Sequence, residues 1–168
     1  MVKNYGQKIA DLTINGTDIA LHSNGESTHV GNDSSFDDEG TYLGLRWQCV
    51  EFIRRYYYLA HGVNLAQQWS DGDAKDWYDN RTAMKLDEIP ADQAQEGDII
   101  TFTGGNWGHV AIISGKGDND SLLMSGQNFY NDQRDVNTVL TPDILSGNTP
   151  LPDGSNAPFF FQSILRLR

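Results

Sequence analysis

The hydrophobic pattern of this chain changes its period once, from that of a helix to that of strands. Between about Thr41 and Ala60, apolar side chains recur every three or four residues, as on one face of an amphipathic helix. After Pro90, short apolar runs bounded by glycine, asparagine, aspartate and proline predict strands at 97–103, 109–114, 121–125 and 159–168. Helices first and an antiparallel sheet second predict an α+β fold.

The remaining segments give weaker predictions. Residues 1–40 are polar and rich in turns, and we expect weak strands followed by an acidic loop, which we interpret as solvated rather than as a calcium site. A second, shorter helix is expected over 70–81, capped by Asp71 or Asp73. Residues 141–158 hold four prolines, which predicts a surface loop before the last strand.

Composition limits the classes of function. A chain of 168 residues with 38% hydrophobic residues is long enough for one globular domain, which we expect to span 1–168 as a monomer. Its net charge of −11 disfavours nucleic acid and anionic membranes as partners. No stretch has the length of a signal peptide's apolar core or of a membrane span, so we expect a cytoplasmic protein, or one exported or released as a trimmed or phage-type enzyme.

The only cysteine, Cys49, is the first candidate catalytic residue. It lies in the first turns of the expected helix, where the helix dipole favours a thiolate and should lower the pKa of the thiol. On the same helix Glu51 should pair with Arg54 and Arg55 on the outer face. A buried free cysteine that acts only as a small hydrophobe is the alternative for Cys49.

A cysteine nucleophile needs a histidine, and His109 is the best placed of the four. It opens the apolar strand at 109–114 directly after the glycine-rich stretch TGGNWG, which lets other backbone or a substrate approach closely. The other three histidines lie in polar segments or at a helix exit, where exposed or capping roles are more common.

A third group must orient the imidazole. If residues 115–120 close a hairpin, Ser114 pairs with Ser121, and His109 then lies opposite Gly126. Residues two apart on a strand share a face, so Asn128 is predicted beside His109, whereas a slip of one residue would select Gln127 instead.

Neighbouring residues complete the predicted cleft. The side-chain amide of Gln48 and the backbone N–H of Cys49 are candidate donors to an oxyanion, although Gln48 could equally be an ordinary surface residue. We expect three aromatic residues to line the cleft, with core packing as the alternative for each: Trp47, Trp107 and Phe129.

Four segments in order, WQCVEFIRRYY, EGDIITF, GHVAIIS and SGQN, resemble the CHAP family of cysteine, histidine-dependent amidohydrolases and peptidases. The resemblance covers about residues 40–130, and the stretch around Cys49 is most similar to the amidase domain of glutathionylspermidine synthetase/amidase. It implies a papain-like α+β fold in which the first helix carries the cysteine and packs on an antiparallel sheet. It also implies Cys49 as nucleophile, His109 as general base and acid, and Asn128 as the asparagine of the family's Glu-x-Asn segment.

Two features depart from that family. Gly126 stands where the family often has a glutamate, which leaves Asn128 or a water to hold the imidazole. No acidic residue lies between Gly40 and Cys49, so the calcium pattern of some phage members is missing. We therefore expect neither a metal nor a cofactor.

Three functions remain open at this stage. The first is hydrolysis of an amide in peptidoglycan peptides through a thioester, and the second is hydrolysis of a small amide such as glutathionylspermidine. The third is an inactive binding module, an alternative that remains because Gly126 stands where the family often has a glutamate.

Overall fold

The computed structural model of the chain describes residues 4–25, 33–70, 72–129, 135–151 and 158–168. Its centre is a six-stranded antiparallel sheet in the order β5-β10-β6-β7-β8-β9. The strands of this sheet are β5 (Leu86–Ile89), β6 (Ile99–Thr103), β7 (His109–Lys116), β8 (Leu122–Ser125), β9 (Thr138–Leu140) and β10 (Phe160–Leu167). Few helices and mostly antiparallel strands make the fold α+β, as predicted.

The helix α1 (Cys49–His61) covers one face of the sheet and contacts β7. Its inner face buries Phe52, Ile53, Tyr56 and Tyr57 completely or almost so, as the helical period predicts. The helix ends at Gly62, whose left-handed backbone lets its N–H bond to carbonyls of the last turn.

Both faces of the central strands are buried, which explains their continuous apolar sequence. Val110 and Ile112 of β7 pack in the core beneath α1, while Ala111 and Ile113 pack in a second core on the opposite face. The short helix α3 (Pro142–Leu145) contributes Ile144 to that second core.

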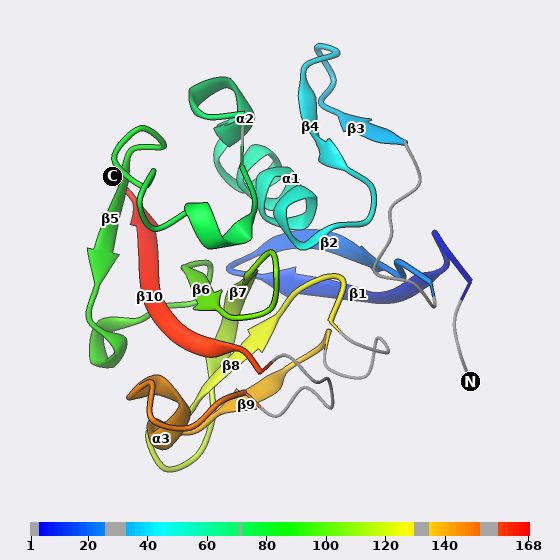
Figure 1. Cartoon of the computed structure of the whole chain (residues 1–168). Coiled ribbons are helices and arrows are strands. Elements are labelled where there is room, and N and C mark those ends of the chain that lie inside the picture. The colour runs from blue at the N-terminus through cyan, green and yellow to red at the C-terminus, as the bar shows by residue number, and fades with distance from the viewer. Residues whose placement is uncertain (1–3, 26–32, 71, 130–134, 152–157) are drawn as a thin grey trace.

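Two hairpins lie beside α1 (Figure 1) and contact it. One is formed by β1 (Lys8–Ile14) and β2 (Thr17–His22), and the other by β3 (Ser34–Phe36) and β4 (Tyr42–Leu45). The acidic stretch forms the second hairpin's turn, where the Asp37 carboxylate accepts bonds from the backbone N–H groups of Glu39 and Thr41.

Several expected boundaries were wrong. The helix begins at Cys49, not Thr41, because 42–45 pairs as a strand and Gly44 lies against the first helical turn, where an added Cβ would be 3.0 Å from the Cα of Glu51. The region 70–81 holds only the 3-10 turn η1 (Ala74–Asp76), capped by Asp73, whereas Asp71 lies outside the described residues. The sequence patterns missed the short elements β5, β9, α3, η2 (Ala91–Gln93) and α2 (Leu65–Gln68).

The glycine-rich connection between β6 and β7 does allow close approach of backbone, as expected. Gly108 adopts φ +66, and a Cβ there would lie 2.7 Å from the backbone nitrogen of Lys75. This contact holds η1 against the start of β7, where Lys75 N–H also bonds to the carbonyl of Trp107. The connection therefore fixes the position of His109 relative to η1.

Substituting Gly108→Ala should destabilise the protein strongly. The matched control is Gly16→Ala, which has a similar φ of +78 but nothing within 4 Å of the added Cβ. Both variants carry the left-handed strain of about 1–2 kcal/mol, and Gly108→Ala adds a backbone clash of at least about 2 kcal/mol. Urea unfolding of both variants measures the difference, and equal losses would contradict the close contact.

Candidate active site

A cavity of about 490 Å³ lies where α1, β4, η1 and β7 meet. Five of the seven site residues predicted from the sequence line it: Gln48, Cys49, Trp107, His109 and Asn128. They come from three segments that are far apart in the chain, and the fold brings these segments to one place.

Cys49 is the first residue of α1 and is 8% exposed. Burial raises the pKa of the thiol to about 11, because the thiolate would lose its hydration. The backbone N–H groups of Val110, Val50 and Cys49 itself act in the opposite direction, but they do not offset the desolvation. The expected lowering of this pKa by the helix dipole is therefore wrong for the resting site.

The interaction with Val110 also locates the thiol. Val110 follows His109 directly in β7, so the sulfur lies beside the start of the strand that carries the candidate base.

His109 is the first residue of β7, is 2% exposed and is packed between aromatic rings. Its ring centroid lies 3.7 Å from that of Phe129 and 5.5 Å from that of Phe159. The Nε2 atom makes no hydrogen bond to any residue that the structure describes. Burial lowers the pKa of His109 to about 3, so the imidazole is neutral near pH 7.

Cys49 and His109 are therefore both neutral in the resting site. A buried thiolate and imidazolium would each lose hydration, and the described residues around them offer no carboxylate that bonds to the imidazole. A neutral imidazole can still accept a proton from the thiol while the sulfur attacks, which is general base catalysis.

Asn128 lines the cavity, but its amide is bonded to residues other than His109. Its Nδ2 donates to Oε1 of Gln48 over 2.7 Å, and its Oδ1 accepts from Nδ2 of Asn24 over 3.1 Å. Asn128 has φ 62, a left-handed conformation that asparagine tolerates better than most residues. In this arrangement Asn128 orients Gln48, and the aromatic rings hold His109.

The hairpin register used to select Asn128 was wrong, although Asn128 does line the cavity. Strand β7 continues to Lys116, and a bulge between Ile113 and Gly115 shifts the pairing, so Ile112 lies opposite Ser125. The connection between the strands is 117–121, where the prediction was 115–120, and Asn119 and Asp120 within it have positive φ.

Gly126 consequently packs against Ala111 instead of lying opposite His109. A Cβ at Gly126 would lie 3.1 Å from the Cβ of Ala111, so little room exists there for a side chain.

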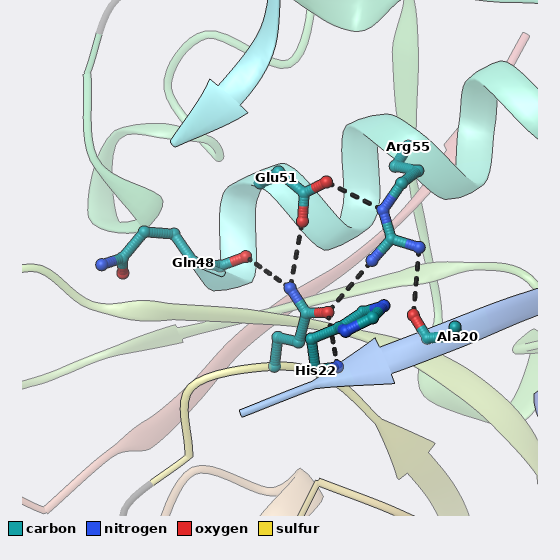
Figure 2. Close-up of polar contacts among 6 residues, drawn as sticks. Ala20, His22, Gln48, Glu51 and Arg55 are labelled. Atoms are coloured by element: carbon teal, nitrogen blue, oxygen red, sulfur yellow. Dashed lines mark hydrogen bonds and ion pairs between the residues drawn. The ribbon is translucent and has the colours of Figure 1, made fainter. Parts of the chain in front are cut away.

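Gln127 is fully buried and ties the start of α1 to the end of β2. Its Nε2 donates to Oε2 of Glu51 over 3.0 Å and to the carbonyl of Gln48 over 3.3 Å. Its Oε1 accepts from the backbone N–H of His22 and from Arg55, both over 3.0 Å. Figure 2 shows Glu51 and Arg55 extending from α1 toward the strand that carries Ala20 and His22.

The ion pair of Glu51 with Arg55 is largely covered, with Arg55 17% exposed, which corrects its expected place on the outer face of the helix. Glu51 Oε1 lies 2.8 Å from Nε of Arg55, and the side chain of Glu51 has no exposed surface. Arg54 is also buried, and its guanidinium donates to the carbonyls of Trp69 and Ser70. The spacing of the charged residues on α1 can be seen in the sequence. The segments that cover these residues in the fold cannot.

The three predicted cleft aromatics have different environments. Trp107 lines the cavity and is 63% exposed, with the Lys75 ammonium 5.6 Å from its ring centre. Trp47 is not among the described residues that line the cavity, and its indole stacks on His22 at 3.8 Å between centroids. Phe129 is 2% exposed and packs in the core beside His109.

Sequence reasoning missed two residues near the cavity. Asn24 follows β2 and reaches Asn128 across 104 positions of sequence, and Asp73 lines the cavity beside η1. No local pattern around Asn24 indicates this contact. Among the described residues, no group of three or more histidine, cysteine or acidic side chains is placed to hold a metal ion.

The chain matches the family model of the CHAP domain over residues 38–128. This match covers more than half of the 168 residues, and the chain belongs to the CHAP family. No curated protein matches the chain. CHAP domains are generally amidohydrolases or peptidases that act on peptide substrates, often in cell walls. In the part of the chain described here, no helix is long and apolar enough to cross a membrane.

Alkylation of Cys49 by iodoacetamide should report the raised pKa of the thiol. With a pKa of about 11, the rate should rise about tenfold per pH unit from pH 6 to pH 10, because only the thiolate reacts. The measurement is the second-order rate at each pH, with urea-unfolded protein as the reference for an ordinary thiol.

Cys49 is the only cysteine, so Cys49→Ser provides a blank without other thiols. A rate that is independent of pH between 5 and 8 would show a preformed thiolate–imidazolium pair and contradict the neutral resting site.

Proposed function

We propose that this protein is a cysteine amidase or endopeptidase that hydrolyses an amide bond in peptidoglycan peptides through a thioester. The observation that carries the proposal is that Cys49, His109 and Gln48 line the same cavity. A thiol, an imidazole and an amide donor are the groups that acyl transfer by a cysteine enzyme needs.

In the proposed reaction the imidazole of His109 takes the thiol proton as the sulfur of Cys49 attacks the carbonyl carbon. The carbonyl oxygen becomes an oxyanion, which the Nε2 of Gln48 and the backbone N–H of Cys49 stabilise. The C–N bond then breaks, the imidazolium protonates the leaving amine, and the acyl group stays on the sulfur. Water, deprotonated by His109, hydrolyses the thioester and restores the thiol.

The cavity suits a short peptide. Its volume of about 490 Å³ is within the usual range for small-molecule sites, and the exposed Trp107 at its edge offers an apolar surface. Burial of both reacting groups strengthens every electrostatic interaction that forms when a substrate displaces water.

A small cationic amide, such as glutathionylspermidine, is the second candidate substrate. The net charge of −11 and the carboxylate of Asp73 in the cavity lining favour a leaving group that is a polyamine. The chemistry at Cys49 is the same in both cases.

Purified sacculi and glutathionylspermidine, each incubated with the protein, separate these functions. We expect new free amines from sacculi and their complete loss in Cys49→Ala, because that variant lacks the nucleophile. Free spermidine instead would support the second candidate.

His109→Gln tests the base and should lower the rate at least about 10²-fold. Sacculi and glutathionylspermidine both left intact, or hydrolysis that persists in Cys49→Ala, would contradict the proposed function.

A further inference from the structure

Three side-chain amides form a chain of hydrogen bonds that ends at the cavity. Nδ2 of Asn24 donates to Oδ1 of Asn128 over 3.1 Å, and Nδ2 of Asn128 donates to Oε1 of Gln48 over 2.7 Å. The three residues come from the segment after β2, the segment after β8 and the position before α1. Asn24 lies outside residues 38–128 that match the family model.

This chain has a direction, because an amide carries its acceptor and its donors on different atoms. Asn128 accepts through its oxygen from Asn24 and donates through its nitrogen to Gln48, which lines the cavity. The carbonyl of Gln48 is thereby occupied by Asn128, and the Nε2 of Gln48 remains to donate to a substrate. If the chain ran in the opposite direction, Gln48 would turn its carbonyl oxygen toward the cavity, where it would repel a developing oxyanion.

We propose that Asn24 is a positioning residue that sets this direction and so makes Gln48 an oxyanion donor. The inference rests on the proposed function, since it concerns the same reaction. Asn24 is 3% exposed, and the neighbouring backbone is fixed by the bond from His22 N–H to Gln127. The end of β2 and the 127–128 segment are thus held together at two points, one of which is the Asn24 side chain.

Asn24→Asp tests this inference because it nearly preserves shape and removes the donor. An ionised carboxylate at this position only accepts, so Asn128 would turn its Nδ2 toward it and offer Oδ1 to Gln48. Gln48 would then donate to Asn128 and present Oε1 to the cavity. Loss of one oxyanion donor costs about 10²–10³ in kcat, and we expect a fall of about 10²-fold with KM changed less than about threefold.

Two further readouts separate this role from a structural one. A peptide aldehyde, N-acetyl-alanyl-alaninal, forms a thiohemiacetal whose oxygen occupies the oxyanion position, and its affinity should fall with kcat. Alkylation by iodoacetamide at pH 9 forms no oxyanion, and its rate should stay within about twofold of the wild type. The control Asn148→Asp adds the same charge at an exposed position outside the cavity lining. It should leave kcat, the affinity for the aldehyde and the alkylation rate unchanged.

The kinetic substrate is sacculi or glutathionylspermidine, whichever gives Cys49-dependent product. Full kcat in Asn24→Asp overturns the inference and leaves the proposed function standing. Equal losses of kcat and of alkylation rate, with a lower melting temperature, also overturn it, because they indicate a structural role.

If Asn24→Asp does not fold, Asn24→Ala replaces it: a loss of about tenfold in kcat with unchanged alkylation supports the inference, and full kcat overturns it. A wild type that hydrolyses neither substrate overturns the proposed function, and the inference with it.

Discussion

The buried amide of Gln127 is the interaction on which the arrangement of the site depends. It joins the first turn of α1 to the end of β2 through Glu51, Arg55 and the backbone of His22. A buried carboxylate or amide without a hydrogen-bond partner would destabilise the folded state. Removing any one of these groups would therefore leave the others without their partners. Because Gln127 also bonds to the backbone of Gln48, this network positions Gln48, the proposed oxyanion donor, in the cavity wall.

Burial governs the chemistry of the site as well as its packing. The same exclusion of water raises the pKa of Cys49 and lowers that of His109, and both groups are neutral before a substrate arrives. The charges that develop during the reaction must therefore be stabilised by fixed groups of the protein. In the proposed reaction the direction of the Gln48 amide is therefore important, and we infer that the hydrogen bonds from Asn24 through Asn128 set it.

The long elements and several residues that line the cavity could be predicted because they depend on local patterns. The period of α1, the runs of β6, β7 and β10, and the positions of Cys49 and His109 follow from the sequence. The register of β7 with β8 could not be predicted, because β7 continues to Lys116 and a bulge between Ile113 and Gly115 shifts the pairing. The burial of Glu51 and the contact of Asn24 with Asn128 depend on segments distant in sequence, which no local pattern reveals.

Trapping the acyl intermediate on the protein tests the central claim most directly. Intact-protein mass spectrometry after acid quenching during turnover should show an adduct with the mass of the acyl half of the substrate. Peptide mapping should locate it on Cys49, and both His109→Gln and Cys49→Ala should lack it. The sample is quenched at low temperature, where hydrolysis of the thioester is slowed. The account would be contradicted if the wild type turned over substrate under these conditions without an adduct on Cys49. An adduct on another residue would contradict it as well.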